Sequence, residues 1–160
     1  MHRLRLPGLL LLAGLALAAP AGMPRPESGF EGQSVAVEPA RTSIYVGTVT
    51  LTMPTFVRRG AVFESTYDCK VFPYFFANEH GTLRIDVTDA DLDALRRGQP
   101  IDFRGHARSH RDAERTVEGR ATPETPTEGR LKVRVHVSRR IELIFNTRYR
   151  WAAPAPAPSP

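Results

Sequence analysis

The sequence has little of what marks a catalytic or disulfide-held domain. Cys69 is the single cysteine in 160 residues, so no disulfide can form within the chain. No serine lies in a nucleophile-elbow motif, and no glycine-rich phosphate loop is present. No apolar run reaches the roughly 20 residues that a membrane-spanning helix needs. These absences exclude an intramolecular disulfide framework and leave nucleotide binding and serine hydrolysis without a motif.

Metal-binding and acid–base residues are equally sparse. His106 and His110 are four residues apart, but the pattern puts His106 on a strand and His110 in a loop, and no further ligands complete a known spacing. Asp86, Asp102 and Glu118 fall on outward strand faces, where carboxylates are ordinary and define no glycosidase-like pair. We therefore predict no catalytic residue, no metal site and no cofactor.

Residues 1–21 have the pattern of a secretory signal peptide. Arg3 and Arg5 give a basic start, residues 9–19 are apolar, and residues 19–21 (Ala-Pro-Ala) resemble a cleavage site. The short apolar run favours cleavage over the alternative of an uncleaved anchor. We expect an exported protein, periplasmic or secreted, with no stable transmembrane segment after cleavage.

The composition then divides the chain into three parts. Residues 22–41 are rich in Gly, Pro, Ser and Glu without periodicity, which predicts a flexible leader. Residues 152–160 alternate alanine with proline, which predicts a disordered, extended tail. Residues 42–151 remain as a single β-rich domain, large enough to build its own core.

Residues 130–151 carry the clearest pattern in the chain. The odd positions are almost all β-branched, leucine or aromatic, and the even positions are mostly basic, as in a half-buried antiparallel strand. The phase is the same on both sides of residues 138–140. A hairpin with a three-residue loop preserves it, opposing Val137 to Ile141, Val135 to Leu143 and Val133 to Phe145. One long strand, bent at the same point, is the alternative.

The remaining patterns fix the fold class. Strand-like alternation recurs in residues 43–53, 61–71, 82–87, 101–108 and 116–121. Residues 88–98 predict the one helix, with Leu92 and Leu95 on a face that docks on a sheet or across a barrel mouth. We predict an all-β, mainly antiparallel fold: a small sandwich or barrel of seven to eight strands with one short helix.

Most of the positive charge lies in one element. Residues 130–151 hold seven basic residues against a single acid, in a chain whose net charge is +5. The outward residues form a candidate site for an anionic envelope component or another protein: Arg130, Lys132, Arg134, His136, Arg148 and Arg150. Nucleic acid is disfavoured by the export signal and by the lack of aromatic residues among them. The simpler interpretation is a solvated strand face whose charge prevents aggregation.

The densest aromatic run, residues 72–76, gives a second candidate site. Phe72, Tyr74 and Phe76 fit the mouth of a cavity for an apolar ligand, and ordinary packing at a corner is the alternative. Two functions follow from these features. The first is a non-catalytic exported β-domain that acts as a binding or interaction module at the cell envelope through its basic face. The alternative is a carrier of a small lipid-like molecule in an internal barrel cavity.

Overall fold

A computed structural model describes residues 29–152 of the chain. The predicted signal peptide (residues 1–21), residues 22–28 of the predicted leader and residues 153–160 of the predicted tail lie outside the described residues. The elements follow in the order β1 (Ser34–Val37), β2 (Ala40–Ile44), β3 (Gly47–Thr52), β4 (Phe56–Arg59), β5 (Val62–Phe72), the 3-10 helix η1 (Phe75–Ala77), β6 (Glu79–Asp86), α1 (Asp89–Arg96), β7 (Ile101–Ser109), β8 (Glu114–Pro123), β9 (Glu128–Ser138) and β10 (Ile141–Trp151).

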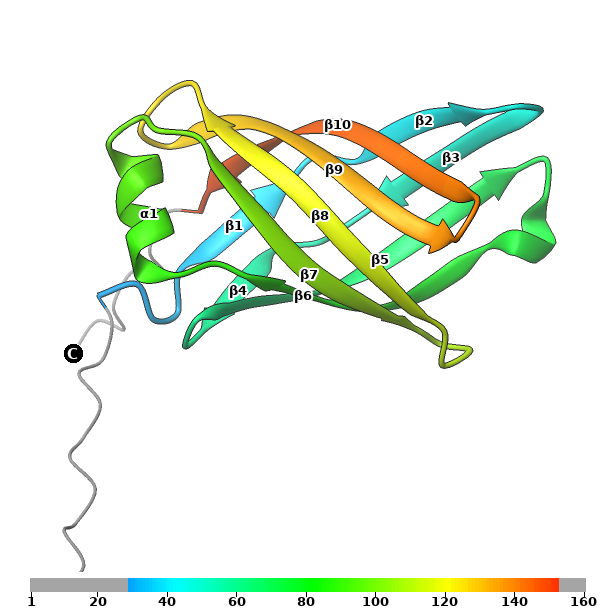
Figure 1. Cartoon of the computed structure of the whole chain (residues 1–160), viewed down its shortest axis with the longest axis horizontal. Coiled ribbons are helices and arrows are strands. Elements are labelled where there is room, and N and C mark those ends of the chain that lie inside the picture. The colour runs from blue at the N-terminus through cyan, green and yellow to red at the C-terminus, as the bar shows by residue number, and fades with distance from the viewer. Residues whose placement is uncertain (1–28, 153–160) are drawn as a thin grey trace, which may run out of the picture.

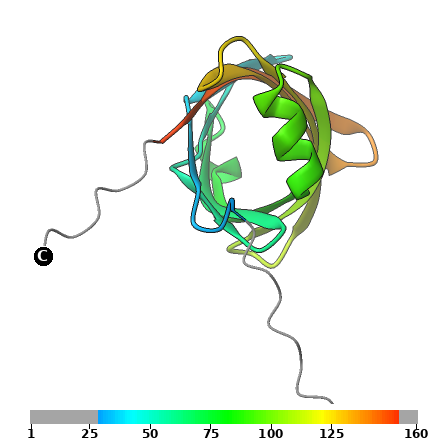
Figure 2. The same ribbon diagram turned by 90° about the vertical axis from the view of Figure 1, so that its left-hand side faces the viewer.

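Eight of the strands close into a barrel (Figures 1 and 2). The order around the ring is β5-β4-β1-β10-β9-β8-β7-β6, and β6 pairs with β5 to complete it. The strands β2 and β3 lie outside this ring, because β3 pairs with β5 beyond the end of β4 and β2 pairs with β3. All of these pairings are antiparallel. The predicted all-β fold with one short α-helix is confirmed, and its architecture is a barrel rather than a sandwich.

The barrel wall follows the alternation read from the sequence. In β10, Phe145 and Tyr149 are buried while Arg148 and Arg150 are exposed. Successive strand residues point to opposite faces, so the apolar side chains of neighbouring strands meet inside the barrel. They form one hydrophobic core, whose removal from water is the main force that stabilises the fold.

The strands β9 and β10 form the predicted hairpin, in nearly the predicted register. Leu143 pairs with Val135 and Phe145 with Val133, as the alternation requires. The common phase on either side of the turn therefore identified the correct inward face of both strands.

The turn of this hairpin differs from the predicted three-residue loop. Ser138 pairs with Ile141, so the turn contains only residues 139–140, and the predicted pairing of Val137 with Ile141 is wrong. The register shifts between Ile141 and Glu142, which leaves Val137 as the extra residue of a β-bulge. A three-residue loop favours glycine in a left-handed conformation, and this turn has none. The bulge restores the phase that the shorter turn would have inverted.

The helix α1 lies across one end of the barrel (Figure 2), which we call the closed end. Thr88 caps the helix: its hydroxyl accepts a hydrogen bond from the Asp91 amide, and the Asp91 carboxylate accepts one from the Thr88 amide. Leu92 and Leu95 are buried against the barrel interior. The prediction that this face docks on the barrel is confirmed.

A buried arginine links α1 to the barrel wall. Arg58 is only 1% exposed, and its guanidinium lies 2.5 Å from Asp89 Oδ1 and donates to the Val87 carbonyl at 2.9 Å. The rings of Phe30 and Phe63 lie 5.8 and 5.4 Å from its Cζ atom. The sequence Arg-Arg-Gly predicts a turn here, which is wrong for Arg58 because it continues the inward phase of β4.

The N-terminal limit of the domain also differs from expectation. The strand β1 and the first residues of β2 fall within residues 22–41, which were predicted to be a flexible leader. Val35 pairs with Trp151 of β10 on one side and with Phe56 of β4 on the other. The structure therefore corrects the leader prediction for residues 34–41, since β1 is the strand that closes the ring.

Candidate ligand-binding site

The barrel end opposite α1, which we call the open end, is formed by four turns (Figure 1). They are residues 45–46 between β2 and β3, 73–78 between β5 and β6, 110–113 between β7 and β8, and 139–140 between β9 and β10. Strand pairing brings these turns to the same end of the barrel. No α-helix of the described chain lies across them.

A cavity of about 260 Å³ lies inside the barrel behind the open end. Its lining is mostly aliphatic, and it includes Ile44, Ala77, Val137 and Ile141, which adjoin three of the four turns. The cavity therefore extends to the open end. A smaller space of about 90 Å³ continues toward α1 and shares four lining residues with it: Met53, Leu83, Val117 and Val133.

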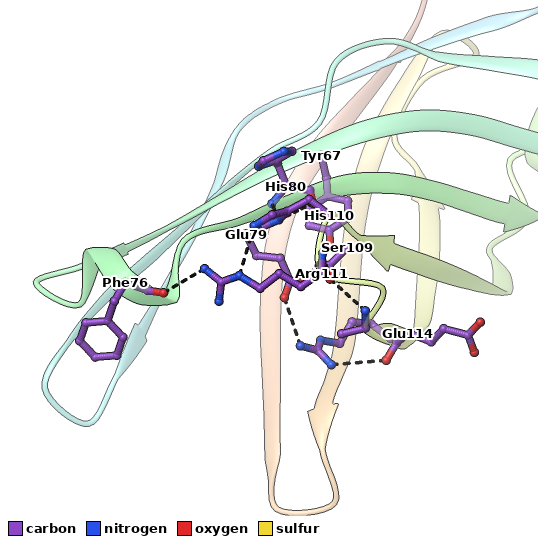
Figure 3. Close-up of polar contacts among 10 residues, drawn as sticks. Tyr67, Phe76, Glu79, His80, Ser109, His110, Arg111 and Glu114 are labelled. Atoms are coloured by element: carbon purple, nitrogen blue, oxygen red, sulfur yellow. Dashed lines mark hydrogen bonds and ion pairs between the residues drawn. The ribbon is translucent and has the colours of Figure 1, made fainter.

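One polar cluster interrupts this apolar lining (Figure 3). The Tyr67 hydroxyl donates to Glu79 Oε1 at 2.7 Å, and Arg115 Nη2 donates to Glu79 Oε2 at 3.1 Å. The side chains of Arg115 and Glu79 are only 20% and 18% exposed. We call Tyr67, Glu79 and Arg115 the interior triad. Partly buried charges need such partners, because loss of hydration is costly when it is not replaced.

Two neighbouring groups of the cavity are held in their protonated forms. Burial raises the pKa of the Tyr67 phenol far above its ordinary value, and the hydrogen bond to Glu79 raises it further. Burial also raises the pKa of the Cys69 thiol to about 11, helped by the Glu79 and Asp68 carboxylates. At neutral pH Tyr67 is a hydrogen-bond donor. Cys69 is a thiol rather than the thiolate that nucleophilic catalysis requires.

The interior triad suits binding of an uncharged polar group. The negative charge of Glu79 is balanced by Arg115, so the cluster offers no excess charge to an ionised ligand. Both donors and acceptors remain, since a guanidinium has five N–H groups and carboxylate and phenol oxygens accept more than one hydrogen bond. A hydroxyl or amide, which both donates and accepts, matches this arrangement.

Sequence reasoning missed the interior triad because it assigned both charged residues to turns. In the structure Glu79 begins β6 and Arg115 lies at the start of β8. The sequence did contain a signal, because residues an even number of positions apart in a strand point to the same face. Glu79 precedes the inward residue Leu83 by four positions, and Arg115 precedes the inward residue Val117 by two.

The aromatic residues predicted to lie at a cavity mouth are found at the open end but outside the cavity lining. Phe72 and Phe76 are 62% and 78% exposed, and Tyr74 packs edge-to-face on Phe76 with ring centroids 5.8 Å apart. The alternative, that they pack in the core at a corner, does not fit these exposures.

The turn between β7 and β8 holds the turn between β5 and β6 (residues 73–78) in place (Figure 3). Arg111 donates to the Phe76 carbonyl at 3.3 Å and to His110 Nε2 at 3.2 Å. The His110 ring stacks on His80 with centroids 4.1 Å apart, and the buried Ser109 hydroxyl accepts from the Arg111 amide. These contacts connect the turn between β7 and β8 to the turn between β5 and β6.

The predicted basic face lies on the outer wall of the barrel, and much of its charge is paired. Arg130 and Arg148 both contact the Glu124 carboxylate, the former at 2.9 Å, and Arg150 lies 3.4 Å from Glu128. These acids come from the turn between β8 and β9 and the start of β9. The structure therefore shows a network of alternating charges where the sequence suggested a strongly basic surface.

Two further residues of the basic face lie beside an acid. Arg134 lies 3.7 Å from Glu142, and His136 Nδ1 lies 3.3 Å from the same carboxylate. Lys132 has no ion pair within residues 29–152. A hollow on the outer wall includes Lys132, Arg134 and Glu118 in its lining.

The histidines considered from the sequence do not converge, whereas the carboxylates of Asp86, Asp102 and Glu118 all line the hollow on the outer wall. His106 points outward from β7, whereas His110 lies in the following turn and stacks on His80. Within residues 29–152, no group of three or more His, Cys, Asp or Glu side chains is placed to hold a metal ion. The same described part of the chain contains no helix that is both long and apolar enough to cross a membrane. No family model, curated protein or solved structure matches the chain.

Proposed function

We propose that the protein carries a small, largely apolar molecule in the cavity behind the open end. The observation that supports this is an apolar space of about 260 Å³ that reaches the open end and contains one satisfied polar cluster. Small-molecule pockets usually enclose about 300 to 1,000 Å³. An apolar cavity of about 150 Å³ already takes up benzene. The cavity therefore suits a compact ligand.

Packing considerations favour a cavity that is filled in use. Protein interiors are close-packed, with few voids larger than a water molecule, and unfilled volume lowers stability. Phe145 and Val133 are almost fully buried beside this space, so the wall around it is well packed. A ligand would restore the missing contacts, and the interior triad would meet its single polar group.

The chemistry of the lining supports transport rather than turnover. Cys69, the one thiol at the cavity, is protonated at neutral pH, and the Glu79 carboxylate is held by two donors. The preferred ligand is a neutral amphiphile with one hydroxyl or amide group. In the compartment that the predicted signal peptide specifies, such a carrier would protect an apolar molecule from water.

The test is binding of a neutral fluorescent probe, 1-aminoanthracene, to the full-length protein, with native mass spectrometry of protein purified from its own compartment. Val135→Phe places a larger side chain in the cavity and should lower probe affinity at least tenfold. Lys132→Gln, on the outward face of the same strand, is the matched control and should leave affinity unchanged.

Cys69 provides a second measurement that needs no substitution. It lines the cavity, so a bound ligand should slow its alkylation at alkaline pH, where the thiolate forms. The absence of a co-purifying molecule, together with equal probe binding by wild type and Val135→Phe, would overturn the proposal. Circular dichroism of Val135→Phe and of a second filling variant, Leu143→Phe, separates loss of binding from loss of fold.

Anion binding by the outer wall is a second proposal, which rests on the unpaired Lys132 beside the hollow. It is the weaker one, because an anion would have to compete with Glu124, Glu128 and Glu142 for the arginines. The triple change of Arg130, Arg134 and Arg148 to glutamate tests it. Unchanged association with cell envelopes would remove this function.

A further inference from the structure

The exposed apolar residues of this barrel are concentrated at one end. Of the nine large apolar side chains that are exposed within residues 29–152, seven lie at the open end. We call these seven the apolar rim: Tyr45, Val46, Phe72, Tyr74, Phe75, Phe76 and Ile141. Exposed apolar residues scattered singly need no explanation, but a contiguous group marks a contact surface.

The aromatic part of the apolar rim, residues 72–76, is held in place by packing contacts. Phe72 packs edge-to-face on Phe75 with centroids 5.8 Å apart, and Tyr74 packs on Phe76 in the same way. Arg111 holds the carbonyl of Phe76 from the neighbouring turn. The aromatic rings are therefore presented outward together, although they remain 62–78% exposed at Phe72, Phe75 and Phe76.

Two cations accompany the rim. Arg139 and Arg140 form the turn between β9 and β10, immediately before Ile141 of the rim. Neither guanidinium has an ion-pair partner within residues 29–152, in contrast to the arginines of the outer wall. The open end thus combines exposed aromatic side chains with unpaired positive charge.

We propose that the open end docks on the surface of a lipid bilayer that contains anionic phospholipids. Aromatic residues prefer the interface between headgroups and acyl chains, and arginine is attracted to anionic headgroups. The rim consists of the tips of separate turns at one end of a barrel, a shape that inserts end-on into a soft interface. The described chain enters and leaves at the closed end, where Ala152 bonds to Ser34, so its ends do not obstruct the rim.

This proposal stands on the rim and does not require a ligand in the cavity. It adds a consequence to the proposed carrier function, because the cavity reaches the same end that would face the bilayer. An apolar ligand could then pass between membrane and barrel without crossing water.

The experiment is flotation of the full-length protein with vesicles of phosphatidylcholine alone and of phosphatidylcholine mixed with phosphatidylglycerol. Wild type should float with the mixed vesicles and more weakly with the neutral ones. The exposed pair Phe75→Ser/Phe76→Ser should lower partitioning at least tenfold on both. The pair Arg139→Gln/Arg140→Gln should lower it only on mixed vesicles, by about fivefold per arginine.

The matched control is Val57→Ser/Ile144→Ser, which removes the two exposed apolar residues outside the rim and should leave partitioning unchanged. Val135→Phe should also bind vesicles normally, so a failed carrier function and a failed docking surface give different results. Docking is overturned if wild type does not float with mixed vesicles, or if the control pair loses as much binding as the rim pair. Concentration-dependent dimerisation that the rim changes abolish, without vesicle binding, would identify a second copy as the partner instead.

Discussion

Large apolar residues are buried at the closed end of the barrel and exposed at its open end. At the closed end, Leu92 and Leu95 are buried under α1, and the charge of Arg58 is enclosed by Asp89 and two aromatic rings. At the open end, large aromatic residues face outward, and the charged pair inside the barrel borders a cavity. One end therefore contributes mainly stability, and the other retains exposed and unfilled surface that costs stability. This asymmetry is the pattern expected when one end is reserved for contacts with other molecules.

The largest effect is expected from opening the closed end with Leu92→Ala. Leu92 is 1% exposed in the interior, so the change should lower the free energy of unfolding by about 3 kcal/mol, through lost burial and the cavity left behind. Urea denaturation measures the loss. Asp93→Ala, on the exposed side of α1, is the control and should cost less than about 0.5 kcal/mol. Equal losses would show that α1 does not seal the barrel.

Arg58→Ala should be the next largest change. It removes the buried guanidinium together with its contacts to Asp89 and Val87, and should lower the free energy of unfolding by about 2 kcal/mol. The exposed neighbour Arg59 is the internal control, because its pair with Glu64 spans 3.6 Å at the surface. If Arg59→Ala destabilised the protein as much, burial would not be the reason for the importance of Arg58.

Glu79→Gln should lower the free energy of unfolding by less, about 1 kcal/mol, because the ion pair between Glu79 and Arg115 is partly solvated. Its more specific effect is on Cys69. The Glu79 charge contributes to the raised pKa of that thiol, so its removal should lower the pKa from about 11, although burial remains the larger cause. The pH dependence of iodoacetamide alkylation measures this, and an unchanged profile would contradict the geometry of the cavity.

A further effect is confined to alkaline pH. The pKa of Cys69 is higher in the folded protein, about 11, than the usual 9.0, so as pH rises the unfolded chain loses its thiol proton first. The stability contributed by the neutral thiol is complete below about pH 9 and falls as pH rises toward 11. Thermal unfolding of wild type and Cys69→Ala should therefore converge over this range. A difference in melting temperature between wild type and Cys69→Ala that stays constant over this range would contradict the raised pKa of Cys69.

The sequence predicted the closed end and the barrel wall better than the open end. Alternation in β9 and β10 identified the correct faces, and the spacing of Leu92 and Leu95 identified the docking side of α1. These are local patterns repeated over several residues, and burial of one face enforces them.

The errors have physical causes as well. Arg58 and Arg59 are the same residue type, yet one is buried and the other exposed, because the phase of β4 outweighs the usual preference of arginine for water. Glu79 and Arg115 lie at strand ends, where charged residues resemble turns, and only pairing across the barrel brings them together. The backbone of Phe76 is also held by Arg111, which lies in a turn that is distant in sequence.

Closure of the ring by β1 has a consequence for how the chain folds. The final seam joins Val35, near the start of the described chain, to Trp151, near its end. During synthesis this seam cannot form until Trp151 has emerged, and its long loop must be closed at an entropic cost. Until then, the edges of β4 and β10 are unpaired and open to association with other chains. The folding rate of this barrel should therefore depend on how soon β1 pairs with β10.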